Sequence, residues 1–139
     1  PSELRPDISS LTFRVEPFAE HHLPIVARFS ERYWSRPRTE SFYRWRYLES
    51  LPFSAMFVAK TDSECLGLIC ALRKHYLVER TQAPGLEIFD WHSLPGLKGS
   101  GVGIRVMRAM MRSGITGPVS PALPSARGVG WRFFHCASR

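Results

Sequence analysis

The residues with the clearest chemical potential are the glycines of segment 95–103, which reads P-G-L-K-G-S-G-V-G. Because Gly99, Gly101 and Gly103 have no side chains, their backbone N–H groups can approach an anion closely. An apolar segment at 86–91 precedes them, and a helical pattern at 104–112 follows. A strand, a glycine-rich turn and a helix in this order direct free amides and the positive end of the helix dipole at one point. The segment therefore predicts a binding site for phosphate.

Arginines on the following helix strengthen this prediction. Arg105 and Arg108 lie in its first turns, where positive charges oppose the helix dipole and are locally unfavourable. A bound polyphosphate would reverse the sign of that interaction. The alternative is a glycine loop that begins an ordinary amphipathic helix with solvated arginines. The coincidence of Pro95, Lys98 and three spaced glycines favours the phosphate site.

Two other phosphate-binding loops are excluded by spacing. The Walker loop needs Gly-Lys-Ser/Thr directly before the helix, whereas Gly103 is followed by Ile104. The dinucleotide fingerprint is G-x-G-x-x-G, whereas the spacing here is G-x-G-x-G. On the helix itself, Ile104, Met107 and Met111 are predicted to form the apolar stripe, with Met110 beside it.

The composition describes a folded domain with a basic surface. The chain has 139 residues, of which 44% are hydrophobic and 22% charged, and its formal net charge is +7. This length predicts a single domain over residues 1–139, and the hydrophobic content predicts a globular chain. The positive charge suits an anionic ligand, which could be a nucleic acid, a membrane surface or a polyphosphate.

The cysteines and histidines indicate neither a disulfide framework nor a metal site. Three cysteines without a C-x-x-C pair are typical of reduced thiols in a cytoplasmic protein. Five histidines lack the spacing of zinc ligands, so no metal is expected. The longest apolar run, at residues 65–72, is too short to span a bilayer, and no signal peptide is visible.

The remaining pattern predicts alternating strands and helices. Strands are expected at residues 11–15, 54–59, 64–73, 86–91 and 129–134, with a weak strand around Val119. Helices are expected at 18–33, from Thr39 or Ser41 to Leu48, and at 104–112, whereas 78–85 is expected to be a polar loop. Because one crossover helix follows the glycine loop, we expect an α/β (α+β) fold. Its mostly antiparallel sheet of about six strands would contain one parallel pair and be flanked by helices.

The second of these helices is unusually aromatic. Phe42 and Trp45 are expected to pack on the sheet. For Tyr43 and Tyr47 two interpretations stay open: core packing, or a wall that binds the substrate.

The glycine segment gives the sequence a resemblance to the GNAT acyltransferase superfamily. That family has a V-x-P-x-x-R/Q-G-x-G-x-G/A segment between its fourth strand and third helix. Its proline, basic and glycine positions are occupied here by Pro95, Lys98, Gly99, Gly101 and Gly103. Lys98 replaces the usual Arg or Gln, and Ser93 replaces Val. The order of elements from about residue 11 to 134 is also similar to the GNAT fold, in which a parallel strand pair splays around the cofactor site.

A narrower resemblance covers two further segments. The segment 42–48 followed by Pro52 is similar to the F-x-W-K/R-Y…P segment of a GNAT subgroup that contains larger polysaccharide-related and uncharacterised acyltransferases. The residues Gly130, Trp131 and Arg132 are similar to the G-W/F-R of that subgroup. Because its members are often longer, the resemblance implies that this chain lacks a C-terminal portion.

The resemblance implies direct transfer of an acyl group from a thioester to an amine. A protonated amine has no lone pair, so a carboxylate on the strand before the loop must accept its proton, often through water. Glu87 is the first candidate for this base and Asp90 the second, although each could instead pair with a surface arginine. Strict alternation places the two carboxylates on opposite faces of the strand, and in the family a bulge follows. His92 has a suitable pKa range, but a structural role is favoured.

The resemblance also implies which residues contact the cofactor. Backbone amides near residues 91–93 would face the thioester carbonyl and stabilise developing negative charge. The acetyl-CoA contacts expected in full are Trp91, His92, Ser93, Lys98, Gly99, Ser100, Gly101, Val102, Gly103, Arg105 and Arg108. The family places a tyrosine general acid shortly before the last G-F or G-W, but segment 124–129 contains no tyrosine. No general acid is therefore assigned.

These observations predict an acyl-CoA-dependent N-acyltransferase with acetyl-CoA as the default donor and an amine-bearing acceptor, acting alone or as a homodimer. Two alternatives stay open. One is a GNAT-like module with weak or no catalysis that binds CoA or a protein partner. The other, less favoured because its aromatic residues have core-like spacing, is a nucleic-acid-binding domain built from the N-terminal arginines and aromatics.

Overall fold

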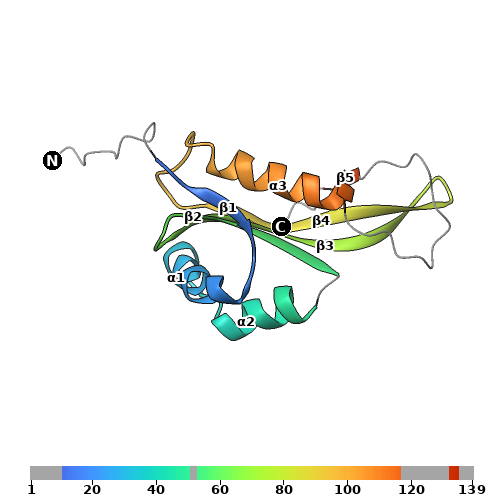
Figure 1. The fold of residues 1–139 in the computed structure, drawn as a ribbon. Coiled ribbons are helices and arrows are strands. Elements are labelled where there is room, and N and C mark those ends of the chain that lie inside the picture. The colour runs from blue at the N-terminus through green and yellow to red at the C-terminus, as the bar shows by residue number, and fades with distance from the viewer. Residues whose placement is uncertain (1–10, 51–52, 117–131, 135–139) are drawn as a thin grey trace.

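The computed structural model describes residues 11–50, 53–116 and 132–134, and in these ranges the chain forms one five-stranded sheet with helices on both faces (Figure 1). The strands are β1 (Arg14–Pro17), β2 (Ser54–Lys60), β3 (Cys65–Val78), β4 (Thr81–Ser93) and β5 (Arg132–Phe134). They follow sequence order across the sheet, and every neighbouring pair is antiparallel except β4 and β5, which are parallel. The predicted fold class and parallel pair are confirmed. The described ranges contain five strands, and the sequence predicts about six for the whole chain. The weak strand predicted around Val119 lies outside the described residues.

The helices cover both faces of this sheet (Figure 1). On one face lie the 3₁₀ turn η2 (Glu20–His22), α1 (Leu23–Tyr33), α2 (Glu40–Arg44) and the π-helical turn η3 (Trp45–Glu49). On the other face lies α3 (Val102–Thr116), which packs on β2, β3 and β4. The predicted second helix is present, and Thr39 is its cap, because its hydroxyl oxygen accepts a hydrogen bond from the Phe42 amide at 3.2 Å.

The predicted polar loop at 78–85 is wrong. Strand β3 runs to Val78 and β4 begins at Thr81, so only Glu79 and Arg80 form the turn between them. Both turn residues have positive φ, 49° and 66°, which matches the twist that a two-residue hairpin requires. Pro84 and Gly85 weaken a strand locally, but they pair with His75 and Lys74 in a ladder that extends for the whole length of the hairpin.

The buried stripe of α3 also differs from the predicted one. Val102, Val106 and Met110 are buried against the sheet, whereas Ile104 and Met111 are 58% and 39% exposed. Both sets have helical spacing, so the sequence alone does not decide between them. The helix begins at Val102, two residues before the predicted start, so Val102 joins Val106 and Met110 on the buried face.

Close packing between α3 and the sheet depends on Gly67 of β3. A Cβ atom at this position would lie 2.7 Å from Cγ1 of Val102 and 2.8 Å from the backbone oxygen of His92. Side-chain carbons do not approach other atoms this closely. Glycine at position 67 therefore allows the start of α3 and the end of β4 to meet above the same point of β3.

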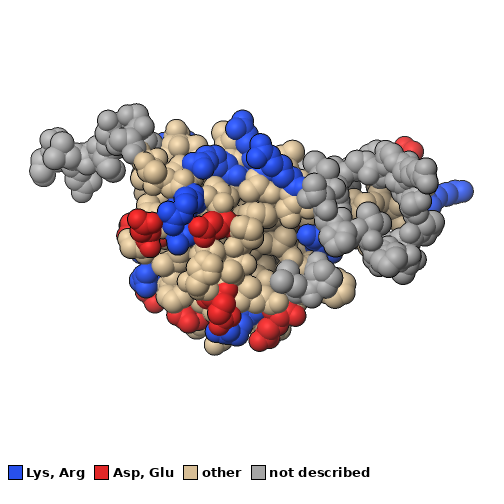
Figure 2. All heavy atoms as spheres, in the orientation of Figure 1, with Lys and Arg blue, Asp and Glu red and all other residues tan. Residues whose placement is uncertain are grey.

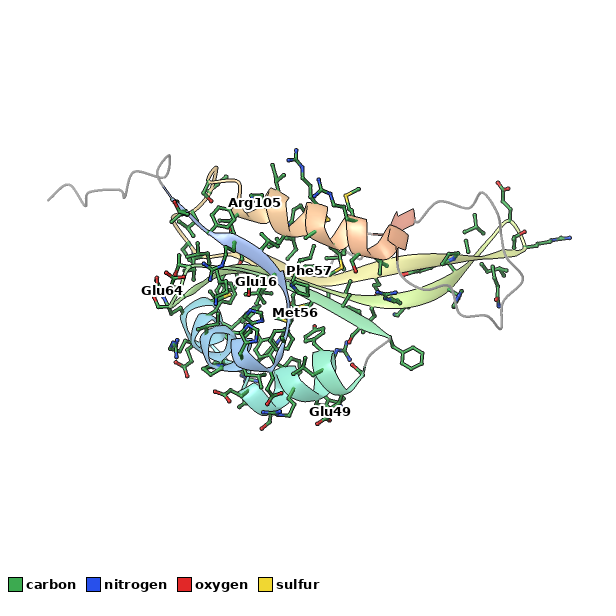
Figure 3. The ribbon with its side chains drawn as sticks, viewed as in Figure 1. Glu16, Glu49, Met56, Phe57, Glu64 and Arg105 are labelled. Atoms are coloured by element: carbon green, nitrogen blue, oxygen red, sulfur yellow. The ribbon has the colours of Figure 1, made fainter. Side chains whose placement is uncertain are left out.

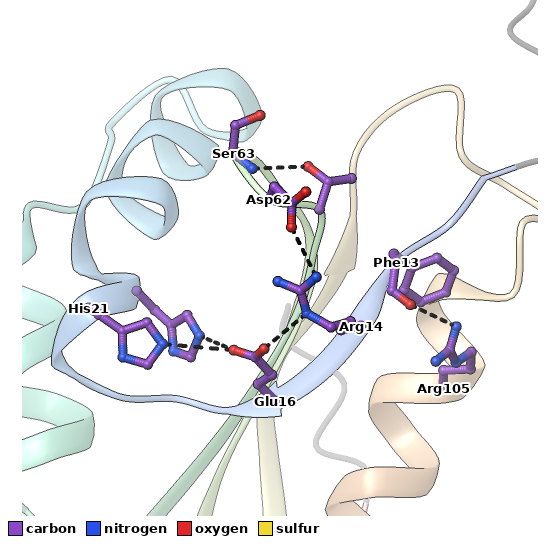
Figure 4. A network of polar contacts seen from close by, with 9 residues as sticks. Phe13, Arg14, Glu16, His21, Asp62, Ser63 and Arg105 are labelled. Atoms are coloured by element: carbon purple, nitrogen blue, oxygen red, sulfur yellow. Dashed lines mark hydrogen bonds and ion pairs between the residues drawn. The ribbon is translucent and has the colours of Figure 1, made fainter.

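A polar network fixes β1 to its neighbours (Figure 4). His22 is fully buried, and its Nδ1 accepts a hydrogen bond from the Ala19 amide at 3.0 Å. The proton of the neutral ring is therefore on Nε2, which donates to Glu16 Oε2 at 2.7 Å. Arg14 binds Glu16 on β1 at 3.2 Å and also binds Asp62, in the turn between β2 and β3, at 3.0 Å. The hydrogen bond from His22, together with that from Arg14, lowers the pKa of Glu16 from 4.5 to about 2.

The first prediction concerns packing at Gly67. We expect Gly67→Val to lower the free energy of unfolding by about 1–3 kcal/mol, because the added side chain overpacks the contact with Val102. Gly103→Ala is the control, since a Cβ there meets its nearest atom at 3.6 Å, an ordinary contact. Urea denaturation of both variants measures the difference. Equal stability of the two variants would contradict this account of Gly67.

The second prediction concerns acid stability. The pKa of Glu16 in the folded protein lies below its ordinary value, so its stabilising contribution is present above about pH 4.5 and is lost as the pH falls toward 2. Glu16→Gln should be less stable than the wild type at pH 7, and the difference should shrink as the pH is lowered through this range. Denaturation curves at stepwise pH measure it. A difference that does not change with pH would show that the charge of Glu16 contributes nothing.

Candidate functional site

A β-bulge at Phe89 reshapes the strand that carries both candidate carboxylates. Across the β3–β4 ladder Leu72 pairs with Glu87 and Cys70 pairs with Asp90, and the register shifts between the two pairs. Phe89 is the extra residue on β4. Residues that pair across a ladder share a face, and positions two apart on β3 also share a face. Glu87 and Asp90 therefore lie on the same face, which corrects the alternation expected for an unbulged strand.

That shared face is the one covered by α1 and α2. Asp90 forms an ion pair with Arg38, from the segment between these two helices, and His92 Nδ1 lies 2.9 Å from the hydroxyl of Tyr33 on α1. Trp91 points to the opposite face, where its Nε1 donates to the backbone oxygen of Gly103 in the first turn of α3 at 2.9 Å. The end of β4 thus contacts the glycine loop on one side and presents carboxylates on the other.

Asp90 is held in its ionised form. The residue is only 7% exposed, it pairs with Arg38, and His92 Nε2 lies 3.5 Å from its Oδ1. Burial alone would raise the pKa of Asp90, but the hydrogen bonds from His92 and Arg38 outweigh burial and lower it. Arg38 is itself fixed, because its guanidinium lies 4.8 Å from the ring centroid of Trp34 and 5.0 Å from that of Phe42. A carboxylate with a lowered pKa is a weak proton acceptor.

Glu87 has a different environment. Its side chain is partly exposed and forms an ion pair with Lys74 of β3. The alternative interpretation, a carboxylate paired with a surface cation, is thus observed, with a lysine in place of the expected arginine. Glu87 also pairs with Phe134 at the end of the described parallel ladder, which covers Gly85–Glu87 on β4. Within the described ranges, Glu87 is therefore the last residue of β4 that pairs with β5.

The glycine loop has the backbone conformation that glycine permits. Gly96, Gly99 and Gly101 have φ values of 88°, 86° and 86°, a region that other residues rarely adopt. Two short turns shape the loop, because the Leu97 amide donates to Leu94 and the Ser100 amide donates to Leu97. The predicted loop is therefore present, although α3 begins at Val102 and includes Gly103 in its first turn.

The amides at the end of this loop are available to a ligand. Among the hydrogen bonds of the described residues, none has the N–H of Gly99, Gly101, Gly103 or Ile104 as donor. The Val102 amide reaches only the Ser100 hydroxyl, at 3.4 Å. Free N–H groups at a helix start, next to glycines without side chains, form an anion-binding site.

The exposed face of α3 is strongly basic. Figure 2 shows Lys and Arg atoms over this helix with no acidic atom among them, and its sequence contains no Asp or Glu. Arg108 is exposed, as is Lys98 in the loop. Arg105 lies at the start of α3 near β1 (Figure 3), where its guanidinium lies 4.1 Å from the ring centroid of Phe13 and donates to the Phe13 backbone oxygen at 3.3 Å. The exposed charges of Lys98 and Arg108 therefore lie on the loop and helix that carry the free amides, whereas Arg105 is held against Phe13.

The predicted substrate tyrosines lie in the core. Tyr43 and Tyr47 are buried, and burial raises the pKa of Tyr43 to about 12 and raises that of Tyr47 as well. We base no substrate role on either hydroxyl. Several N-terminal arginines that suggested nucleic-acid binding contact protein atoms instead: Arg28 binds the Ser63 backbone oxygen, Arg32 binds Glu64, Arg38 binds Asp90, and Arg44 binds Glu20.

One group of potential metal ligands lies away from β4. The ligand atoms of Glu16, His21 and His22 lie within 4.8 Å of one another. Nε2 of His22 could bind a metal only if its proton moved to Nδ1, which faces the amide hydrogen of Ala19. We therefore assign this group the structural role shown in Figure 4. In the described ranges, no helix combines the length and the apolar character that a bilayer span requires.

Several partners at the site had no signal in the sequence. Arg38 belongs to the basic turn at 35–38, but its ion pair with Asp90 joins residues 52 positions apart. The contact of His92 with Tyr33 spans 59 positions. The ion pair of Lys74 with Glu87 is not predicted, because the sequence predicts that the strand ends at residue 73. In the structure β3 continues to Val78 and includes Lys74. Only the paired geometry of the helices and strands reveals these contacts.

Comparison with known proteins supports the fold assignment. No family model and no curated protein matches the sequence. The chain is similar to the solved structure of AAC(6')-Iy in complex with the bisubstrate analogue CoA-S-monomethyl-acetylneamine, at 17% identity, with 92% of this chain and 81% of that chain covered and a TM-score of 0.66. It is also similar to the aminoglycoside 6'-N-acetyltransferase AAC(6')-Ih from Acinetobacter baumannii, at 16% identity, 91% and 80% coverage and a TM-score of 0.64.

A third solved structure, Arabidopsis thaliana NAA60 in complex with a bisubstrate analogue, matches at 10% identity, 77% and 69% coverage and a TM-score of 0.58. These three proteins are N-acetyltransferases with the GNAT fold. At such identities the likeness establishes the fold, and the predicted GNAT fold is confirmed.

Proposed function

Starting from the GNAT fold, we propose that this protein is an acyl-CoA-dependent N-acyltransferase that transfers an acetyl group from acetyl-CoA to an amine. The observation that carries the proposal is that the amides of Gly99, Gly101, Gly103 and Ile104 have no acceptor among the described residues, at the start of a basic helix. Similar structures support it, because AAC(6')-Iy and NAA60 were solved with bisubstrate analogues, the former with one that contains CoA.

The donor side of the site is the face of α3. The amides of Gly99, Gly101 and Gly103 would bind the diphosphate of the cofactor, and the charges of Lys98 and Arg108 would attract it. When bound, the cofactor supplies an acyl thioester. Trp91 holds the first turn of α3 against β4 through its bond to Gly103, so the phosphate site and the reacting strand keep a fixed distance. Backbone amides of β4 at 91–93 would stabilise the charge that develops on the thioester oxygen.

The acceptor side is the opposite face, which carries the two carboxylates. The attacking amine must lose a proton, and Glu87 is better suited than Asp90 to accept it. Asp90 is nearly buried, its partners Arg38 and His92 hold it ionised, and its pKa is lowered. The Lys74 partner of Glu87 has a side chain that is 43% exposed, and ion pairs near the surface are weak. Glu87 can therefore exchange Lys74 for the amine or for a bridging water.

The reaction does not require a dedicated acid for the departing sulfur. A thiol has a pKa of roughly 8.5, so a thiolate is a tolerable leaving group near neutral pH. Segment 124–129, which lacks a tyrosine at the family position of the acid, lies outside the described residues. We therefore propose Glu87 as general base and assign no acid.

A second candidate function is a module that binds CoA without turnover. The observation that favours it is that both carboxylates already have cationic partners, Lys74 for Glu87 and Arg38 for Asp90. Release of free thiol from acetyl-CoA across a panel of amines separates the two functions. Thiol release that depends on the acceptor supports the transferase, whereas binding without release supports the module.

The third prediction tests the phosphate site. We expect acetyl-CoA to bind the wild type in a calorimetric titration and to bind Gly101→Glu at least about tenfold more weakly, because the new carboxylate repels the diphosphate. Gly96→Glu is the matched control, since it has the same positive φ and open surroundings but lies at the far end of the loop. If both variants bind like the wild type, or if both lose binding equally, the free amides are not the phosphate site.

The fourth prediction tests the base. We expect Glu87→Gln to lower kcat by roughly 10²- to 10⁴-fold while the Kd of acetyl-CoA stays unchanged, because a carboxamide cannot accept the proton. The loss should narrow as the assay pH is raised toward the pKa of the amine, since more of the acceptor is then already deprotonated. Lys74→Met, which removes the partner of Glu87, should keep most of the activity. Full activity of Glu87→Gln at neutral pH would exclude this role.

A further inference from the structure

The acceptor face carries two exposed rings and one half-buried cation that the proposed reaction does not use. Trp45 and Arg46 of η3 and Phe89 at the bulge form it, and we call these three residues the acceptor-side shelf. The rings of Trp45 and Phe89 are large and apolar, yet they are 57% and 44% exposed, so the expectation that Trp45 packs on the sheet is wrong. The guanidinium of Arg46 lies 5.9 Å from the Trp45 ring centroid and 5.1 Å from the Phe89 ring centroid. Two exposed rings therefore flank one cation.

The charge of Arg46 is not neutralised by a carboxylate. Among the ion pairs of the described residues, the two neighbouring cations of this face are matched, Lys74 by Glu87 and Arg38 by Asp90, whereas Arg46 has no acidic partner. Glu49 lies one turn further along the chain, but it points away from the sheet (Figure 3). The shelf therefore presents a net positive charge beside the bulge.

The shelf borders the proposed base. The Phe89 ring contacts Arg46 on the η3 side and also lies 5.6 Å from the Lys74 nitrogen, whose partner is Glu87. One aromatic ring is thus shared by the unmatched cation and by the ion pair that holds the base. An acceptor with its amine at Glu87 would extend across Phe89 and bring its other end to Arg46.

We propose that the acceptor-side shelf selects amines that carry a carboxylate on a flat apolar body, and that it disfavours polycationic acceptors. This inference rests on the proposed function and deepens it. A guanidinium binds a carboxylate through two parallel hydrogen bonds and stacks on aromatic rings, so Arg46, Trp45 and Phe89 together match both parts of such a molecule. The uncompensated charge repels a second ammonium group, which aminoglycosides carry in several copies.

The test uses two amines that differ only in charge, 4-(aminomethyl)benzoate and 4-(aminomethyl)benzamide. We expect the wild type with CoA present to bind the benzoate about tenfold more tightly than the benzamide, measured by calorimetry. Arg46→Gln should remove this preference and leave the Kd of the benzamide unchanged. Arg46→Lys should keep part of it, because the charge remains but the bidentate geometry is lost. The control is Arg44→Gln, which removes the same charge from a residue that pairs with Glu20.

The outcomes separate this inference from the proposed function. Equal binding of both amines by the wild type, or equal loss of the preference in Arg46→Gln and Arg44→Gln, overturns the shelf. A preference that depends on Arg46 supports the proposed selectivity of the shelf, whether or not the protein is a transferase. Absence of thiol release from acetyl-CoA with every amine would overturn the transferase function but not this selectivity. Thermal unfolding of each variant shows whether it is folded. If Arg46→Gln does not fold, Arg46→Lys is used in its place, and a reduced preference for the benzoate is the expected result. An aminoglycoside such as sisomicin that binds more tightly than the benzoate would also overturn the proposed selectivity.

Discussion

One extra residue in β4 determines how the candidate site is arranged. Without the bulge at Phe89, alternation would turn Asp90 toward α3 and separate it from Glu87. With the bulge, both carboxylates and His92 face α1 and α2, while Trp91 faces the first turn of α3. In the transferase that we propose, the strand would therefore separate anion binding on one face from proton removal on the other. The same residue exposes its own ring to solvent, where it contacts Arg46.

The charges near Asp90 and those near the glycine loop differ in how far opposite charges balance them, and this difference matches the two roles that we propose. Around Asp90 the positive and negative groups are matched and nearly buried, which stabilises the position of the segment between α1 and α2 but leaves little capacity to exchange protons. Around the glycine loop the cations have no acidic neighbours on α3, and the free amides add positive potential without a side chain. Lys98 in the loop and Arg108 on α3 are both exposed, so they could attract an anion that binds there.

The sequence was sufficient for the parts of the structure that depend on local chemistry. The glycine loop, a helix cap at Thr39 or Ser41 and a strand directly before the loop all follow from residues close together in the chain, and the structure has Thr39 as the cap. The predictions that were wrong concern tertiary packing. Residues 81–85 contain proline and glycine, but pairing with β3 makes them part of β4, and only Glu79 and Arg80 form a turn. Helix α3 has two apolar stripes that both fit a helix, and the sheet buries the one that contains Val102, Val106 and Met110. The ion pairs of Arg38 and Lys74 could not be predicted, because they depend on the helix placement and on the length of the hairpin.

Close contact between β3, β4 and α3 joins the glycine loop directly to the strand that carries both carboxylates. Gly67 has no side chain, so Val102 and the backbone of His92 can both approach β3 at one point. Trp91 then ties β4 to Gly103 across the same junction. A phosphate bound to the amides of this first turn would therefore be positioned relative to β4 by these packing contacts. A transferase of this design would use binding energy from the diphosphate to place a thioester beside β4, and the acceptor needs only to reach the other face of the same strand.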